Sequence, residues 1–204
     1  MAMTLWRGPN PLILASRSHA RQMLLANAGI GFEAVPADID ERIVQLRSSV
    51  SAAGEVATIL ARQKALAVSG QRSASIVIGA DQTLALSGQL FNKPNGRAQA
   101  VAQLRALAGQ THELHSAATV ACDGKILFEH VATARLTMRT LGEAEIAAYL
   151  DAAGEAVTSS VGAYQLEGFG VHLFERIDGD HFTILGLPLL PLLGFFRSQC
   201  LLAI

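Results

Sequence analysis

This chain has few charged residues and very few lysines. Charged side chains make up 16% of its 204 residues, whereas soluble domains usually contain roughly 25%. Lysine occurs only at Lys64, Lys93 and Lys125. The 16 basic and 17 acidic residues leave a formal net charge of −1. This balance excludes a broad basic surface, so neither nucleic acid nor an anionic membrane is expected as a partner.

Cysteines and long apolar runs are also scarce. Cys122 and Cys200 lie far apart without C-x-x-C spacing, which excludes a disulfide framework and a zinc knuckle and favours reduced thiols in the cytoplasm. The N-terminus shows no apolar run typical of a secretory signal. Residues 185–196 are intensely apolar, but two prolines interrupt them and they fall short of the roughly 20 residues of a membrane span. We expect a buried terminal helix there, which could lie at a subunit contact.

Helical and strand patterns are mixed along the chain without a repeat or a linker, which predicts a single domain of residues 1–204. The residues 75–86 are expected to form two strand halves around Gly79 and Asp81, and Asp123-Gly124 is expected to turn a hairpin. This mixture predicts an α/β or α+β fold around a mixed sheet. The other expected strands are 11–15, 32–35, 111–122, 126–138 and 171–177; the expected helices are 18–29, 55–68, 97–108, 143–151 and one starting near Pro188.

A first candidate site is the segment ASRSHAR, residues 15–21, at the expected start of a helix. The N-terminus of a helix favours acidic residues, yet Arg17 and Arg21 lie here. Free backbone N–H groups, the hydroxyls of Ser16 and Ser18 and two guanidinium groups would together bind a phosphate. The segment alone supports an exposed cap with solvated arginines about equally well. It lacks the G-x-x-x-x-G-K-[ST] pattern of a P-loop.

Carboxylates form a second group of candidates. Asp81 follows the apolar residues SIVIGA, and ligands of open α/β sheets bind where strands end. Asp81 could hold Mg²⁺ or accept a proton from water, or it could cap a turn. Asp38, Asp40 and Glu41 cluster in an expected loop. They could share a divalent cation, or they could be a solvated acidic loop.

Two lysines and a glycine-rich loop complete the candidates. Lys64 lies in an expected helix, and Lys93 precedes a proline, which favours extended backbone. Either lysine could serve the site or be an ordinary surface residue. In the loop 162–170, Tyr164 could pack on a ligand ring and Glu167 could accept hydrogen bonds from a base. The absence of H-E-x-x-H and G-x-S-x-G argues against a metalloprotease and a serine hydrolase.

Nine motifs follow one another along the chain: LILASRSHAR, ADIDER, the lysine of LARQKALAV, IGADQT, NKP, GQTHELHS, GAYQLEGFG, ERIDGD and GLPL. In this order the chain resembles the Maf family of nucleoside triphosphate pyrophosphatases, from about Leu12 to the last helix. The resemblance implies a mixed twisted sheet with flanking helices, in two lobes around a deep cleft, as in the inosine-triphosphate pyrophosphatases. It also implies a frequent homodimer.

The implied reaction is the metal-dependent hydrolysis, with Mg²⁺ or Mn²⁺, of a nucleoside triphosphate to the monophosphate and pyrophosphate. Expected roles are phosphate or substrate contact for Ser16, Arg17 and Arg21, metal binding for Glu41 and Asp81, proton acceptance for Asp81, and catalysis or phosphate binding for Lys64 and Lys93.

Three positions depart from the commonest form of the family, and they resemble its base-selecting positions. They are Ala20 in place of arginine, Gln82 in place of threonine, and Glu167 in place of glutamine. Gln82 with Glu167 resembles the 7-methyl-GTP branch, and a carboxylate can accept hydrogen bonds from guanine. Ala20 fits neither branch. We therefore expect 7-methyl-GTP as substrate. The alternatives are dTTP or UTP hydrolysis within the same family, and an inactive nucleotide-binding regulator of cell division. For an active enzyme, the resemblance implies a role in nucleotide-pool cleaning.

Overall fold

The computed structural model describes residues 4–48 and 50–204. Its strands are β1 Leu12–Leu14, β2 Phe32–Ala34, β3 Val77–Leu86, β4 Gln89–Phe91, β5 Thr111–Cys122, β6 Lys125–Met138 and β7 Phe174–Asp178. Its α-helices are α1 His19–Asn27, α2 Glu41–Ser48, α3 Ala53–Ser69, α4 Arg97–Leu107, α5 Glu143–Ala153, α6 His181–Ile184 and α7 Leu189–Ser198. Three short 3₁₀ helices are η1 Gly154–Thr158, η2 Val161–Ala163 and η3 Phe169–Leu173.

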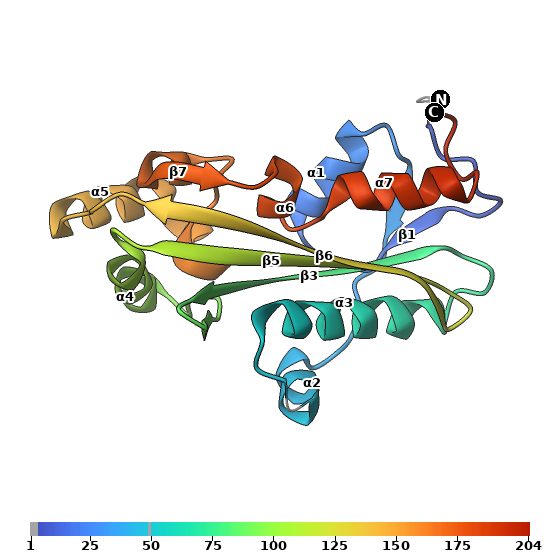
Figure 1. Cartoon of the computed structure of the whole chain (residues 1–204), viewed down its shortest axis with the longest axis horizontal. Coiled ribbons are helices and arrows are strands. Elements are labelled where there is room, and N and C mark those ends of the chain that lie inside the picture. Colours follow the sequence, from blue (N-terminus) through green and yellow to red (C-terminus); the bar gives the residue numbers. More distant parts are fainter. Residues whose placement is uncertain (1–3, 49) are drawn as a thin grey trace. The chain divides into compact units, whose positions relative to one another are not determined.

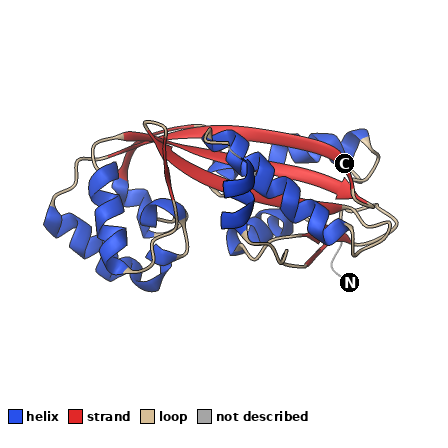
Figure 2. Cartoon of the chain, turned by 90° about the horizontal axis from the view of Figure 1, so that it is seen from below, coloured by secondary structure: helices blue, strands red, loops and turns tan. Residues whose placement is uncertain are grey.

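The strands form one mixed sheet with helices against it (Figure 2). The strand order is β2-β1-β3-β5-β6-β7, and β4 pairs with β3. β1 is parallel to both β2 and β3, whereas β4 is antiparallel to β3 and β7 is antiparallel to β6. The expected mixed α/β fold with a mixed sheet and flanking helices is confirmed.

The chain divides into two compact units. The first comprises Met1–Gln82, Ser116–Ala132 and Gly186–Ile204; the second comprises Thr83–His115 and Thr133–Leu185. The long strands β3, β5 and β6 contribute residues to both units. The expected single domain of residues 1–204 stays a prediction.

In the first unit, α3 packs on β3 with almost no space between the two backbones. Ala57, Ala61 and Ala65 are fully buried and share one face of α3 at intervals of four residues. Opposite them lies Gly79, where an added Cβ would be only 2.1 Å from the carbonyl oxygen of Ala61 and 2.5 Å from the backbone nitrogen of Ala65. The other face of the sheet carries α1 and α7 (Figure 1).

Two expectations about local structure near the site are wrong. β3 is one continuous strand, so Asp81 lies inside it and not at its end. Gly79 does not interrupt this strand. Its lack of a side chain instead allows α3 to pack closely against β3. Glu41 is also not in a loop: it opens α2, and the Asp40 carboxylate accepts a hydrogen bond of 3.1 Å from the backbone N–H of Ile43. Short polar side chains such as that of Asp40 are common in loops, but this one caps the helix α2.

Several other expectations are confirmed. Ser18 caps α1 by accepting from the backbone N–H of Arg21. Asp123 and Gly124 both have positive φ in the tight turn between β5 and β6. Cys122 and Cys200 are free thiols.

The strand expected from residue 171 begins only at Phe174, because a 3₁₀ helix precedes it. Among the described residues, no helix has the length and apolar character needed to cross a membrane.

The core of the second unit contains a buried histidine and a buried tyrosine. His112 is fully buried, and its Nε2 lies 2.7 Å from the hydroxyl of Tyr164. The ring of Phe174 packs against both. Tyr164, expected to pack on a ligand ring, is a core residue with 4% of its surface exposed. Nδ1 of His112 has no hydrogen-bond partner within the described chain.

We expect His112 to make the protein sensitive to acid. Burial lowers the pKa of His112 from 6.5 to about 4, so between these values the unfolded chain holds a proton that the folded protein does not. Stability therefore falls as the pH falls through this window, by about 3 kcal/mol in the free energy of unfolding. Urea unfolding at pH 7 and pH 4 measures the loss. His112→Gln cannot titrate there, and an equal loss in that variant would show that other groups are responsible.

Candidate active site

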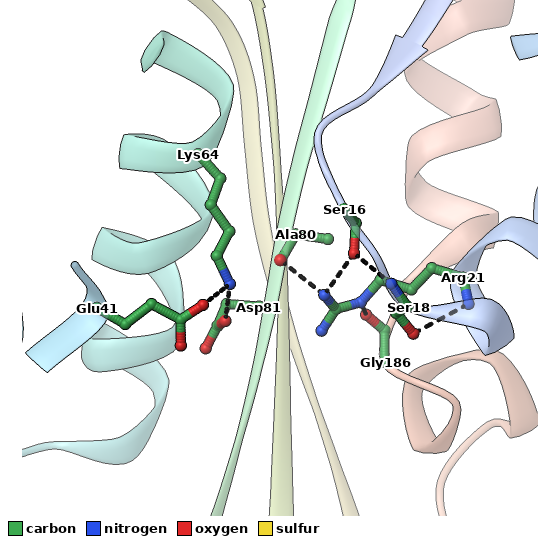
Figure 3. Close-up of polar contacts among 8 residues, drawn as sticks. All are labelled: Ser16, Ser18, Arg21, Glu41, Lys64, Ala80, Asp81 and Gly186. Atoms are coloured by element: carbon green, nitrogen blue, oxygen red, sulfur yellow. Dashed lines mark hydrogen bonds and ion pairs between the residues drawn. The ribbon is translucent and has the colours of Figure 1, made fainter. Parts of the chain in front are cut away.

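One lysine in the first unit holds two carboxylates from different elements (Figure 3). Nζ of Lys64 lies 2.6 Å from Oδ1 of Asp81 and 2.7 Å from Oε1 of Glu41. Lys64 comes from α3, Asp81 from β3, and Glu41 from the first residue of α2. Asp81 follows Gly79 by two residues and so points to the same face of β3. The close packing at Gly79 therefore places Lys64 beside Asp81.

Asp81 is an unusual carboxylate because it is buried next to two cations. Burial raises its pKa above the ordinary value; Lys64 and Arg21 act in the opposite direction, and Glu41 adds to the increase. A carboxylate with a raised pKa is a stronger proton acceptor than an exposed one. Glu41 differs, because 55% of its side chain is exposed while only 10% of the Asp81 side chain is.

Arg21 lies on the other side of β3, where its guanidinium binds a backbone carbonyl of this strand (Figure 3). The N–H groups of Ile13 and Ala15 donate to the carbonyls of Ile76 and Ile78. The next carbonyl on this edge belongs to Ala80, but β1 has already ended at Leu14. Nη1 of Arg21 donates to this carbonyl at 2.8 Å. A side chain thus takes the place of a strand next to Asp81.

The rest of the Arg21 guanidinium is also held inside the protein. Nε donates to the carbonyl of Gly186 at 2.7 Å, and Nη1 also donates to Oγ of Ser16 at 3.2 Å. The same Ser16 oxygen accepts from the backbone N–H of Ser18. Burial lowers the pKa of Arg21, while Asp81 and Glu41 act to raise it. Nη2 makes no hydrogen bond within the described chain and is the atom left for an anion.

Gln82 follows Asp81 and points to the Arg21 side of β3. Its Nε2 donates to Oγ of Ser116 on β5 at 2.9 Å. A Cβ added to Gly186 would lie 3.6 Å from Oε1 of Gln82 and 3.3 Å from Nη2 of Arg21. Gly186 and the side chains of Gln82 and Arg21 are therefore close neighbours. Ser116 and the Gly186 carbonyl were not among the site residues expected from the sequence. Both occur within the family-like motifs GQTHELHS and GLPL, which was the available signal.

Four other expected site residues, Arg17, Ala20, Lys93 and Glu167, take part in none of the side-chain contacts described above for Lys64 and Arg21. Arg17 is exposed and Ala20 is half-buried beside Arg21 in α1. Lys93 and Glu167 belong to the second unit, where both are exposed. Their roles stay predictions.

The described residues fit a divalent cation only in part. In residues 4–48 and 50–204, no group of three or more His, Cys, Asp or Glu side chains is placed to hold a metal. Of the two alternatives for Asp38, Asp40 and Glu41, this arrangement does not support a shared cation, because Asp40 caps α2 and Glu41 turns to Lys64. Glu41 and Asp81 do converge on one cationic nitrogen. Two hard oxygen ligands with water and substrate phosphates are the usual donors for Mg²⁺.

Comparison with known proteins gives a consistent family. A family described as "Maf-like protein" matches residues 11–199. A "nucleoside triphosphate pyrophosphatase" of Bradyrhizobium diazoefficiens is 67% identical over 99% of this chain and 100% of its own length. A protein of that name from one strain of Rhodopseudomonas palustris is 64% identical over the same shares of both chains. A "7-methyl-GTP pyrophosphatase" of Rhizobium etli is 55% identical over 92% of this chain and 95% of its own.

A solved structure, a nucleoside-triphosphatase or dITP/XTP pyrophosphatase from Mycobacterium abscessus, covers 94% of this chain and 96% of its own. Its sequence identity is 14% and its TM-score is 0.40. This likeness is too weak to support a conclusion about fold or activity.

Proposed function

Because the chain belongs to the Maf-like family, we propose that it is a hydrolase that converts a nucleoside triphosphate to the monophosphate and pyrophosphate. The observation that carries this proposal is the pair of Asp81 and Lys64, 2.6 Å apart and largely buried. A buried carboxylate with a raised pKa can take a proton from water, and the ammonium beside it can stabilise an anion.

Asp81 is the proton acceptor in this proposal. A water molecule attacks the α-phosphorus, its proton passes to a carboxylate oxygen of Asp81, and the bond to the pyrophosphate oxygen breaks. Lys64 offsets the negative charge that builds on the phosphoryl oxygens. Nη2 of Arg21 contacts the phosphates from the other side of β3. Ser16 holds Arg21 through its hydroxyl and so positions that contact.

Glu41 and Asp81 would hold the expected Mg²⁺ or Mn²⁺. When bound, such an ion supplies charge neutralisation on the phosphates and lowers the pKa of the attacking water. The location of Glu41 at the N-terminus of α2 leaves its carboxylate mostly exposed, so it can reorient toward a cation without unfolding its surroundings.

For the base, we propose 7-methylguanine. The support is Gln82, fixed by Ser116 at 2.9 Å, the resemblance of Gln82 and Glu167 in the sequence to the 7-methyl-GTP branch, and the name of the 55% identical Rhizobium etli relative. dTTP or UTP is the alternative within the family. An inactive regulator of cell division is the rival class, and the retention of Glu41, Lys64 and Asp81 as one cluster argues against it.

A substrate panel tests this proposal. Pyrophosphate release is measured with Mg²⁺ and, in turn, 7-methyl-GTP, dTTP, UTP, ITP and GTP. We expect the highest kcat/KM with 7-methyl-GTP, by about tenfold or more over dTTP and UTP. A preference for dTTP or UTP would contradict the base assignment alone. No release from any of the five would favour the regulator. The homodimer, the cytoplasmic location and the role in nucleotide-pool cleaning stay predictions.

A further inference from the structure

We propose that Lys64 is an internal counter-ion of the metal site, which weakens the binding of a divalent cation alone and so couples the cation to the triphosphate. This inference rests on the proposed function, since it concerns the same site. It assigns Lys64 a role toward the metal in addition to its role toward the phosphates.

The geometry shows an ammonium placed where a cation would be held. Its distances to the two carboxylates are nearly equal, 2.6 Å to Asp81 and 2.7 Å to Glu41. Only 12% of the Lys64 side chain and 10% of the Asp81 side chain are exposed. In such a site, opposite charges interact more strongly than at the surface. Lys64 therefore competes with a metal ion for the same oxygen atoms.

The charge balance explains why the ion alone would bind weakly. Glu41 and Asp81 together carry two negative charges, and Lys64 neutralises one of them. A divalent cation entering this cluster meets one net negative charge, and it is repelled by the ammonium. Both effects, the neutralisation of one carboxylate charge and the repulsion by the ammonium, are removed when Lys64 binds another partner.

A triphosphate provides that partner. Its oxygens can accept the three hydrogen bonds of the ammonium, and Lys64 can then leave the carboxylates to the ion. Glu41 is 55% exposed, so it has room to follow either cation. By linkage, a nucleotide that tightens metal binding is itself bound more tightly in the presence of the metal, by the same factor.

The test measures Mn²⁺ binding by electron paramagnetic resonance of the free ion, without nucleotide. We expect Lys64→Met to lower the Kd for Mn²⁺ by about tenfold or more relative to the unmodified protein. Lys64→Arg keeps the positive charge, so its Kd is expected to stay within about threefold. Circular dichroism and thermal melting establish that each variant is folded, and Lys64→Gln replaces Lys64→Met if that variant does not fold.

Arg62→Met is the matched control. Arg62 lies two residues away on α3, but its Nε and Nη2 bind the carboxylate of Glu129 at 2.8 and 2.7 Å. This variant removes one positive charge from the same helix without touching Glu41 or Asp81. Its Kd for Mn²⁺ is expected to stay unchanged. Equal tightening in Arg62→Met and Lys64→Met would show a general charge effect and overturn the inference.

A second measurement tests the coupling. Calorimetry gives the Kd of the α,β-methylene analogue of 7-methyl-GTP with and without Mn²⁺. The factor between the two values is expected to be larger in the unmodified protein than in Lys64→Met. A folded Lys64→Met with unchanged or weaker Mn²⁺ binding overturns the inference even if the protein releases pyrophosphate. Tighter Mn²⁺ binding in Lys64→Met, together with no pyrophosphate release by the unmodified protein from any of the five nucleotides, supports the inference and contradicts the proposed function.

Discussion

Asp81→Asn is expected to lower kcat/KM by at least about a thousandfold, because it removes both the proton acceptor and one of the two carboxylates near Lys64. Asparagine has nearly the same shape and can still accept a hydrogen bond from Lys64, so the fold is expected to remain intact. Pyrophosphate release under saturating Mg²⁺ and substrate measures the loss. Turnover near that of the unmodified protein, in a folded variant, would remove Asp81 from the mechanism.

The same substitution is expected not to lower stability at neutral pH. Burial raises the pKa of Asp81 in the folded protein, so the folded state retains this proton at a pH where the unfolded chain has lost it. The ionised carboxylate thus opposes folding once the pH rises through the folded pKa. Asparagine avoids this penalty. Urea unfolding is expected to show Asp81→Asn at least as stable as the unmodified protein at pH 7.

Glu33→Gln is the control for Asp81→Asn. It also replaces a carboxylate of the first unit by an amide, but Glu33 is half exposed and pairs with Arg72 at 2.7 Å. An exposed ion pair of this kind contributes about 1 kcal/mol or less. Turnover and stability are therefore expected to change little. A comparable loss of turnover in both variants would mean that the assay does not report on the site.

Gly79→Ala is expected to lower both stability and turnover. The added Cβ would lie 2.1 Å from the carbonyl oxygen of Ala61, which is backbone and cannot rotate away, so α3 must move. Overpacking of this kind costs about 3 kcal/mol, or roughly 10 °C in Tm. Since α3 carries Lys64, a shift of about 1 Å is expected to reduce kcat roughly 100-fold. Thermal melting and pyrophosphate release measure the two effects.

Gly194→Ala is the matched control, because it makes the same change inside α7. A Cβ at Gly194 would meet no heavy atom within 4 Å, and alanine is the better helix former by about 0.5–1 kcal/mol. This variant is expected to be as stable as the unmodified protein or slightly more so. Gly79→Ala behaving like Gly194→Ala would contradict the close approach of α3 to β3.

The sequence predicts those parts of the fold that depend on local pattern. The apolar runs, the Ser18 cap and the Asp123-Gly124 turn all place elements correctly, because each depends on neighbouring residues. Two local predictions failed where tertiary packing decides. A glycine that usually weakens a strand is required inside β3 by the approach of α3, and an acidic segment that resembles a loop begins a helix at Glu41.

The sequence predicted some members of the candidate site, but not their arrangement. Lys64, Asp81 and Glu41 do form one cluster, as the family resemblance suggested. Arg21 was expected simply to contact phosphate, yet its hydrogen bonds go to the carbonyls of Ala80 and Gly186, which are 59 and 165 residues away. No pattern in one sequence reveals which backbone carbonyls lack a partner.

The early end of β1 has a consequence for access to Asp81. If β1 continued, the backbone N–H of residue 17 would be next in register to donate to the Ala80 carbonyl, and a strand would run past this part of β3. The chain instead fills one position of the ladder from α1, with a single guanidinium. The Ala80 carbonyl beside Asp81 thereby has a hydrogen-bond partner, while in the described residues β1 pairs with β3 only at Val77 and Ile78, so it does not run past Asp81.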